Sequence, residues 1–258
     1  MTSKTIAQGA EAIITLNDNK ITKNRIKKSY RIKEIDERLR KSRTRSEAKI
    51  MNKLKEIIPV PKIIKTDEKQ EIIMEFIDGK KISDNLESLD YKDISKIIGE
   101  TTALVHNQNI IHGDLTTSNM IYVENHIGKN KLSKDSLDVS TNQSTDSKIN
   151  DIKNKTARKV SKRNVKSNIN QNHENESANS EGKVFLIDFG LAFHSQKIED
   201  KAVDLHLLQQ ALEAKHFTIW QECFEIILQN YEKTALQAKE IIQRIKVIES
   251  RGRYREKF

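Results

Sequence analysis

Two polar motifs in this chain carry the residue types that phosphoryl transfer needs. The first is His112-Gly113-Asp114, with Asn119 five residues after the aspartate, and the second is Asp188-Phe189-Gly190. Phosphoryl transfer needs metal ions held against the phosphates and a carboxylate near the attacking hydroxyl group. Asp114 suits the carboxylate role, whereas Asn119 and Asp188 suit metal binding, and Gly190 permits a sharp turn after an apolar strand. Asp-Phe-Gly alone is a common turn, but the two motifs in this order predict binding of Mg²⁺ and ATP.

A phosphate-binding lysine, and a glutamate that orients it, are expected upstream of these motifs. Lys23 ends the run Lys20-Ile21-Thr22-Lys23, and Glu47 lies in the helix that is predicted to follow. An ion pair between them would keep the ammonium group aimed at the α- and β-phosphates of ATP. Because Lys27 and Lys28 lie close by, spacing alone leaves the choice of lysine open.

The hydrophobic pattern predicts the strands and helices that must position these residues. β-branched content predicts strands over Ala10–Leu16 and Gln70–Phe76. Apolar residues at helical spacing predict four helices, over Ile32–Leu54, Asp93–Asn107, Lys201–Ala214 and Ala235–Ile248. Met120–Val123 and Lys183–Ile187 are short apolar strands that are expected to pair as a hairpin, which would join the two halves of the site.

Two histidines are candidate metal ligands and three aromatic residues are candidate functional residues, but the sequence favours neither assignment. Neither His106 nor His112 has a second ligand at metal spacing. We therefore expect His112 to orient the catalytic loop by hydrogen bonding and His106 to be structural. The helical spacing of Phe217, Trp220 and Phe224 predicts packing in the core.

Residues 125–182 differ sharply in composition from the rest of the chain. They contain no Phe, Trp, Tyr, Met or Cys, and Asn and Ser dominate. Such a segment buries too little apolar surface to offset the entropy lost on ordering. We predict a disordered insertion at the tip of the hairpin, where extra length costs little free energy. The basic stretch Lys155–Lys166 is either a nuclear signal or part of a polar filler.

Positive charge is concentrated near the N-terminus. The 258-residue chain has a formal charge of +9, and residues 20–49 hold thirteen Lys or Arg against four acidic residues. This excess suits a polyanion such as RNA, although a solvated helix face would have the same composition. The single cysteine, Cys223, excludes an internal disulfide, and no apolar run reaches transmembrane length. We expect a soluble intracellular protein that does not contact membranes.

Several motifs occur in order along nearly the whole chain outside residues 125–182. They are Gln8-Gly9-Ala10-Glu11-Ala12, Lys28-Ser29-Tyr30-Arg31, Arg43-Thr44-Arg45-Ser46-Glu47-Ala48, His112-Gly113-Asp114-Leu115-Thr116-Thr117-Ser118-Asn119, Ile187–Leu191, Glu199–Leu205 and Arg251-Gly252-Arg253. With them the chain resembles the kinase/ATPase subunit of the KEOPS (EKC) complex, the PRPK family of small atypical serine/threonine protein kinases. The string from His112 to Asn119 is the most specific part of the resemblance.

The resemblance implies an α+β, bilobal protein-kinase-like fold with a minimal C-terminal lobe. Residues 1–77 would form the ATP-binding N-terminal lobe and residues 78–258 the C-terminal lobe, with the insertion 125–182 in a hairpin of that lobe. The implied function is Mg-ATP-dependent support of threonylcarbamoyladenosine modification of tRNA. The implied partners are the threonylcarbamoyl-transferase subunit and a small regulatory subunit, with tRNA reached through the complex, in cytoplasm and nucleus.

Matching the family's motifs to this sequence assigns a role to each site residue. Asp114 becomes the catalytic base, Lys23 the phosphate lysine with Glu47 as its partner, and Asn119 and Asp188 the metal ligands. The residues expected at the nucleotide are Ile6, Gly9, Ala10, Glu11, Ala12, Ile14, Lys23, Glu75 and Ile77. The chain departs from the family in its insertion, and in Lys27, where the family usually has proline.

Two absences bear on what the phosphoryl acceptor is. Gly113 stands where regulated kinases have an arginine, and no Ala-Pro-Glu occurs in the 70 residues after Asp188. Both favour ATP hydrolysis, or transfer to a bound partner, over recognition of free peptides. A free-standing serine/threonine protein kinase, a non-catalytic scaffold and a small-molecule phosphotransferase are the alternatives. The basic segment Arg251–Phe258 is either a frayed terminus or a contact for tRNA or a partner.

Overall fold

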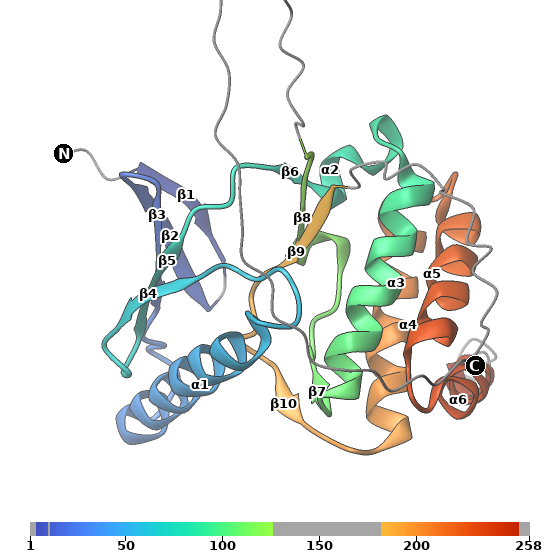
Figure 1. The fold of residues 1–258 in the computed structure, drawn as a ribbon. Helices are drawn as coiled ribbons and strands as arrows, with labels where there is room; N and C mark the ends of the chain where they lie inside the picture. The colour runs from blue at the N-terminus through green and yellow to red at the C-terminus, as the bar shows by residue number, and fades with distance from the viewer. Residues whose placement is uncertain (1–3, 10, 126–181, 253–258) are drawn as a thin grey trace, which may run out of the picture. The chain divides into compact units, whose positions relative to one another are not determined.

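The computed structural model describes residues 4–9, 11–125 and 182–252. Ala10, residues 126–181 of the predicted insertion with the basic stretch Lys155–Lys166, and residues 253–258 lie outside the described residues. A small sheet with one helix is followed by a part built mainly of helices (Figure 1). This is the two-lobed α+β arrangement that the sequence predicts, whereas the boundary between residues 77 and 78 stays a prediction.

A five-stranded antiparallel sheet forms the N-terminal lobe. Its strands are ordered β1-β2-β3-β5-β4, so β3 is central. Their bounds are Lys4–Gln8 for β1, Ala12–Asn17 for β2, Lys20–Arg25 for β3, Ile63–Thr66 for β4 and Glu71–Glu75 for β5. Asn17 pairs with Lys20, and Asp18 and Asn19 between them have φ values of 46° and 57°. Aspartate and asparagine tolerate this left-handed backbone, which suits a two-residue hairpin turn.

Helix α1 (Lys33–Leu54) covers this sheet and agrees with the predicted helix to within one residue. Ile50, Met51 and Leu54 are buried on its inner face, and α1 packs against β4 and β5. Buried polar residues share that face, Glu47 among them. Ile35, one of the apolar residues in the predicted helix, is instead 42% exposed, whereas its neighbour Asp36 is buried.

The second lobe contains four longer helices and several short elements. Their bounds are β6 Lys80–Lys81, α2 Ile82–Asn85, η1 Leu86–Ser88, α3 Tyr91–Asn107, β7 Ile110–Ile111, η2 Thr117–Asn119, β10 Phe193–His194, α4 Ile198–Lys215, α5 Trp220–Thr234 and α6 Ala238–Gly252. Helix α3 packs against α5, and α4 against α6 (Figure 1). A Cβ added at Gly99 of α3 would lie 2.4 Å from the Ile227 carbonyl oxygen, so glycine allows the close approach of α3 and α5.

The predicted hairpin is confirmed. Strand β8 (Met120–Val123) pairs antiparallel with β9 (Lys183–Leu186), with Met120 opposite Leu186 and Val123 opposite Lys183. Strand β8 begins directly after Asn119, and Asp188 follows two residues after β9. The hairpin therefore places the two predicted metal ligands at the same end of a strand pair.

Helix α5 was predicted only through the spacing of its aromatic residues. Phe224 is buried and Trp220 is half-buried, but Phe217 is 76% exposed, so its predicted core position is wrong. Phe217 precedes α5, and the helical spacing therefore does not apply to it. Among the described helices, none is both long enough and apolar enough to cross a membrane.

Candidate active site

Strand β3 presents two basic side chains on one face. Lys23 and Arg25 are alternate residues and are 4% and 5% exposed, whereas Asn24 between them faces solvent. Lys23 lies opposite Ile14 of β2 and Ile72 of β5, so its backbone is held on both sides. The central strand thus supplies a rigid base for the lysine predicted to bind phosphate.

Glu47 of α1 joins both of these cations. It is fully buried, and its Oε1 accepts from Lys23 Nζ at 2.7 Å while its Oε2 accepts from Arg25 Nη2 at 2.5 Å. A buried carboxylate needs this compensation because its desolvation costs several kcal/mol. The structure therefore brings Lys23 and Glu47 together as an ion pair, and Arg25 is a partner that sequence reasoning did not single out.

Asp188 completes this group from the other lobe. Lys23 Nζ lies 2.6 Å from Asp188 Oδ1, and the Gly190 N–H donates to the same oxygen at 3.2 Å. Asp188 has a φ of 60°, a left-handed conformation that costs free energy in a non-glycine residue. Burial raises the pKa of Asp188, but Lys23, the Gly190 N–H and Arg25 hold this pKa below its ordinary value. The carboxylate is therefore charged at neutral pH.

The loop from His112 to Asn119 carries the predicted base. Asp114 is exposed, and the Asn119 side-chain N–H₂ donates to both its carbonyl oxygen and its Oδ2, each at 2.9 Å. This leaves the amide oxygen of Asn119 as the atom that can bind a metal. Gly113 has a φ of 76°, and a Cβ there would lie 2.6 Å from the Leu191 carbonyl oxygen. Only glycine fits this position without strain.

His112 orients the loop through hydrogen bonds, as predicted. Its Nδ1 accepts from the Asp114 backbone N–H at 3.3 Å, which places the ring proton on Nε2. That Nε2–H donates to the Ile187 carbonyl oxygen at 3.1 Å. The ring therefore links Ile187, the residue before the predicted metal ligand Asp188, to the predicted base Asp114.

Asp204 of α4 anchors the same loop and was missed by sequence reasoning. It is 1% exposed and accepts from the backbone N–H groups of His112 at 2.8 Å and Gly113 at 2.9 Å. His106, which is structural as predicted, donates from Nε2 to Asp204 at 3.2 Å and contacts the Tyr231 hydroxyl through Nδ1 at 2.8 Å. Burial raises the pKa of Asp204, but His106 and His112 hold this pKa below its ordinary value. The available signal was a carboxylate among the apolar positions of a helix.

The loop between β1 and β2 is tied to α1 by charge. Glu11 accepts from Arg43 of α1 at 2.8 Å and from Arg31, which precedes α1, at 3.3 Å. Burial raises the pKa of Glu11, but Arg43 and Arg31 hold it below its ordinary value. Its carboxylate therefore fixes the loop to the helix, and contact of Glu11 with a nucleotide stays a prediction.

The remaining residues predicted at the nucleotide lie on the sheet or beside it. Gly9 donates its backbone N–H to the Ala12 carbonyl oxygen at 3.0 Å, and Ala12 is buried. Ala10 lies outside the described residues. The other four stand on β1, on β2, at the end of β5 and just after it, and are Ile6, Ile14, Glu75 and Ile77. Ile6 is 44% exposed and Ile14 is half-buried. Their contact with a nucleotide stays a prediction.

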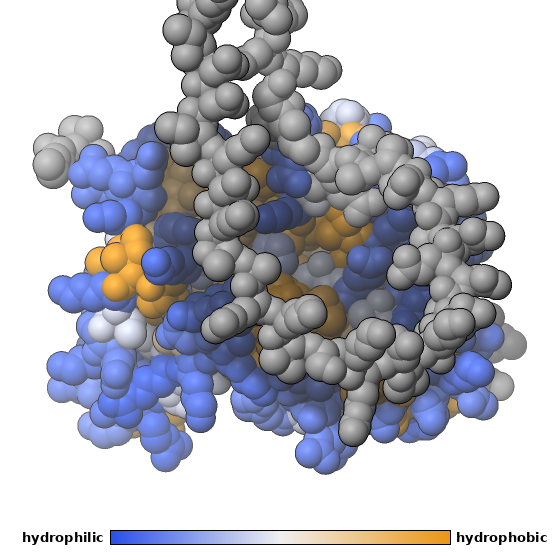
Figure 2. Space-filling view, in the orientation of Figure 1, coloured by the Kyte–Doolittle hydropathy of each residue, from blue (hydrophilic) through white to orange (hydrophobic). Residues whose placement is uncertain are grey.

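Part of the positive charge of residues 20–49 is neutralised by ion pairs inside the protein. Arg40 Nε lies 2.8 Å from the buried Asp36, in addition to the pairs that hold Glu11 and Glu47. The exposed cations of α1 are Lys33, Arg38, Lys41, Arg45, Lys49 and Lys53. Figure 2 shows hydrophilic side chains over the visible face of this helix. A polyanion would therefore meet a smaller charge than the formal charge of residues 20–49.

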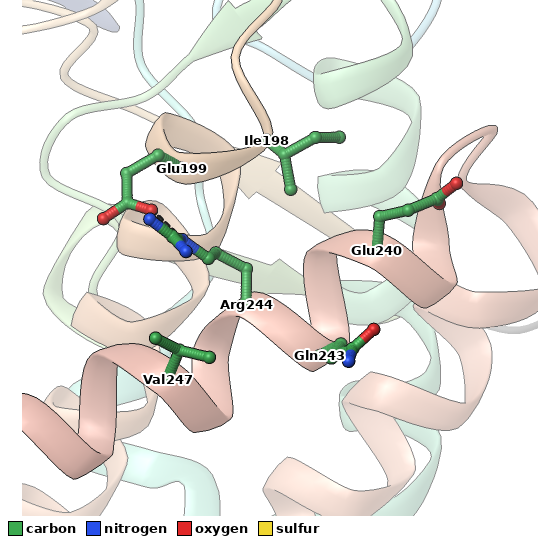
Figure 3. Close-up of a pocket in the computed structure, with 6 residues that line it drawn as sticks. All are labelled: Ile198, Glu199, Glu240, Gln243, Arg244 and Val247. Carbon is green, nitrogen blue, oxygen red and sulfur yellow. Dashed lines mark hydrogen bonds and ion pairs between the residues drawn. The ribbon is translucent and has the colours of Figure 1, made fainter.

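A pocket of about 370 Å³ lies between the start of α4 and helix α6 (Figure 3), and none of the predicted site residues lines it. It is lined by Ile198, Glu199, Glu240, Gln243, Arg244 and Val247. Arg244 forms an ion pair with Glu199, and Arg251 lies 3.1 Å from the same carboxylate. Arg251 belongs to α6, which extends beyond the predicted helix, so this first residue of the basic C-terminal motif has an internal partner.

The donor atoms of the site fit Mg²⁺ bound together with a nucleotide. The described residues contain no group of three or more His, Cys, Asp or Glu side chains that could hold a metal alone. Asp188 and Asn119 offer oxygen ligands, which Mg²⁺ prefers, and Mg²⁺ commonly completes its shell with water and substrate phosphates. The pair suits a metal that arrives with phosphate groups.

Comparison with known proteins relates the chain to one family model and to named relatives. A family model described as RIO domain matches residues 13–129. The chain is 35% identical to the KEOPS complex subunit Bud32 of Pyrococcus abyssi, over 98% of this chain and 97% of the relative. It is also 34% identical to a probable bifunctional tRNA threonylcarbamoyladenosine biosynthesis protein of Methanobrevibacter smithii, over 96% of this chain but only 36% of that protein.

A solved structure supports the fold. WaaP in complex with acyl carrier protein matches with a TM-score of 0.53 at 10% identity, over 96% of this chain and 88% of that chain. The predicted α+β, protein-kinase-like fold is confirmed. Given its 35% identity over nearly the full length of both chains, this protein belongs to the Bud32 family of KEOPS complex subunits.

Proposed function

We propose that this chain is a Mg-ATP-dependent kinase/ATPase subunit that supports threonylcarbamoyladenosine modification of tRNA within a KEOPS complex. The observation that carries the proposal is the contact of Lys23 with both Glu47 and Asp188, at 2.7 Å and 2.6 Å. This arrangement joins the phosphate lysine, its orienting carboxylate and a metal ligand at one point.

Each residue of the candidate site has a separate role in the proposed reaction. Lys23 neutralises charge on the α- and β-phosphates, and Glu47 keeps its ammonium group oriented. Asp114 is exposed and accepts the proton of the attacking water or hydroxyl group, while Asn119 fixes its carboxylate by donating at 2.9 Å. Asp188 and Asn119 would hold Mg²⁺, which when bound neutralises charge on the transferred phosphoryl group. Asp204 and His112 keep the loop in position.

Residues on the sheet are proposed to enclose the nucleotide. They are Ile6, Gly9, Ala10, Glu11, Ala12, Ile14, Glu75 and Ile77; of these, Ile6 lies on β1, Ala12 and Ile14 on β2, and Glu75 on β5. The proposed division into an N-terminal lobe of residues 1–77 and a C-terminal lobe of residues 78–258 places the nucleotide between sheet and helices.

The proposed partners follow from the relatives. In the Methanobrevibacter smithii protein the matching part makes up 36% of a chain named as bifunctional in threonylcarbamoyladenosine biosynthesis. A fused second part supports a stable association with a threonylcarbamoyl-transferase subunit, and a small regulatory subunit would complete the complex. The complex would bring the chain to tRNA, in cytoplasm and nucleus.

A free-standing serine/threonine protein kinase is the second candidate, because the same residues would serve transfer to a protein hydroxyl group. The two candidates are separated by measuring ATP turnover of the chain alone, with the transferase subunit, and with that subunit and tRNA. We expect turnover to rise in the presence of the partner and to be lost in Asp188→Ala. Asp93→Asn, a partly exposed aspartate at the start of α3 whose carboxylate pairs with Lys96 at 2.7 Å, is the matched control.

The outcome decides between the candidates as follows. Turnover that is independent of the partner, with transfer to added protein substrates, favours the free-standing kinase. Normal tRNA modification by Asp188→Ala would contradict both and favour a scaffold.

A further inference from the structure

Glu47 is held by two cations through two different oxygens. Lys23 contacts Oε1 and Arg25 contacts Oε2, and both basic side chains come from the same face of β3. Lys23 also contacts Asp188, but Arg25 makes no hydrogen bond to that carboxylate among the described residues. The two cations therefore have different partners: Lys23 contacts the carboxylates of both Glu47 and Asp188, whereas Arg25 contacts the carboxylate of Glu47.

Arg25 also packs against the turn that carries Asp188. A Cβ added at Gly190 would lie 2.9 Å from Arg25 Nη2 and 3.4 Å from Nη1. The guanidinium group therefore fills the space that a side chain at Gly190 would need. One side chain thus contacts α1 through Glu47 and the Asp-Phe-Gly turn through Gly190, while its backbone N–H is bonded to the Gln70 carbonyl oxygen at 3.0 Å.

Bound ATP would change the contacts of Lys23 but need not change those of Arg25. A Lys23 ammonium group that turned toward phosphates would leave Asp188 free to bind a metal and would share its charge with a new anion. Glu47 is 0% exposed, so it would then depend on Lys23 alone if no second cation were present. Arg25 would still hold the other oxygen through its charge-assisted hydrogen bond to Oε2.

Resting on the function proposed above, we infer that Arg25 is a positioning residue that keeps α1 and the Asp188 turn together, with or without nucleotide. Regulated kinases hold their corresponding helix in place with the help of a phosphorylated activation loop. Gly113 stands here where those kinases have the arginine that reads such a phosphate. Arg25 supplies a permanent internal link instead, so the site is assembled without a phosphorylation step.

Hydrogen exchange tests the link directly. Amide exchange is measured in the full-length chain without nucleotide, over Thr44–Met51 of α1 and over α5 as the internal reference. We expect Arg25→Gln to speed exchange in α1 about tenfold or more while α5 is unchanged, with Arg25→Lys intermediate. Arg45→Gln, which removes an exposed arginine of the same helix paired with Glu68, is the matched control and leaves exchange unchanged. Unchanged α1 exchange in Arg25→Gln, or equal acceleration in α1 and α5, would overturn the inference.

Kinetics provides a second readout. We expect Arg25→Gln to lower kcat for ATP turnover about 10- to 100-fold and to change KM for ATP less than about threefold, because phosphate contacts remain but their geometry is loosened. Arg25 acts through Glu47, so Arg25→Gln/Glu47→Gln should be no slower than the slower single variant. Independent, multiplying losses would contradict the inference.

A double-mutant cycle keeps the inference testable even when one single variant misfolds. If Arg25→Gln does not fold, the same cycle is run with Arg25→Lys and with the double variant, which removes both charges of the buried pair and so leaves neither uncompensated. The proposed function fails if the Asp188→Ala variant turns over ATP as fast as the wild type. The inference about Arg25 is tested independently of that result, because hydrogen exchange measures the effect of Arg25 on α1 without any ATP turnover.

Discussion

The Lys23 ammonium group lies 2.6 Å from the Asp188 carboxylate, although the two residues are 165 positions apart in the chain. This contact spans the two lobes and links the predicted phosphate lysine to a predicted metal ligand. Because Lys23 is also the cation that contributes most to lowering the pKa of Asp188, the pair makes a prediction about pH as well as about rate.

Lys23→Met should reduce ATP turnover about 100-fold, since a preorganised charge at the phosphates is lost. It should also raise the pKa of Asp188, because the cation that lowers this pKa most is removed, while burial still raises it and the Gly190 N–H and Arg25 remain. Protonated Asp188 cannot bind Mg²⁺, so Mg-dependent ATP binding should weaken at a higher pH in the variant than in the wild type. Binding measured between about pH 4 and 8 checks this. Lys20→Met, at the exposed start of the same strand, should behave as wild type.

Gly113→Ala should disable the loop that carries Asp114. The added Cβ would lie 2.6 Å from a backbone carbonyl oxygen, at a position with a φ of 76°. We expect the free energy of unfolding to fall by about 2 kcal/mol or more and turnover to fall with it. Urea denaturation and an ATP turnover assay measure the two effects. Gly9→Ala is the matched control for the unfolding measurement, because its Cβ would meet nothing closer than 3.9 Å, and an equal loss of unfolding free energy in both variants would refute the explanation.

Asp204→Asn should destabilise the chain by about 2–3 kcal/mol at neutral pH, because two backbone N–H groups and His106 lose a charged acceptor. The pKa of Asp204 is lower in the folded chain than in the unfolded one, so this stabilisation is complete above the unfolded value. It is lost as the pH falls below about 3.8 toward the folded value. The difference in unfolding free energy between wild type and variant should therefore shrink as the pH is lowered below about 3.8. A difference that grows on acidification would contradict the assignment.

The exposed cations of α1 should matter for tRNA but not for ATP. Lys41→Glu/Lys49→Glu reverses two charges on the outer face of the helix, whereas the pairs that hold Glu11 and Glu47 stay intact. We expect weaker tRNA binding by the assembled complex, a smaller dependence of affinity on salt, and unchanged ATP turnover. Lys239→Glu, an exposed lysine of α6, is the control. Unchanged tRNA affinity would assign these lysines to a solvated helix face.

The fold and much of the site could be predicted because their signals are local. The strands around the hairpin and the helix over residues 32–54 carry clear apolar patterns, and the two loop motifs contain their own chemistry. Strand β1 was missed because all five of its residues are exposed at a sheet edge, so no apolar alternation marks it.

Arg25 and Asp204 were missed for a different reason. Each acts through residues that are distant in the chain: Arg25 through Glu47 and Gly190, and Asp204 through backbone N–H groups more than 90 positions earlier. Arg25 is one of many basic residues in its segment, and Asp204 is one acidic residue in a longer motif, so residue type alone distinguishes neither of them. Only the fold, which buries both, does so. Burial and partners, rather than residue type, identify such positions.

The hairpin of β8 and β9 has a consequence for protein engineering and for divergence within the family. Val123 and Lys183 are paired neighbours, and the opposite end of the same two strands leads directly to Asn119 and Asp188. The separation of these two residues is therefore set by the ladder of hydrogen bonds between the strands and does not depend on what connects their far ends. A two-residue turn such as Asn-Gly could join Val123 to Lys183. The same junction could accept a fluorescent reporter or an affinity module, so chain length can vary here while the spacing of the two predicted metal ligands stays unchanged.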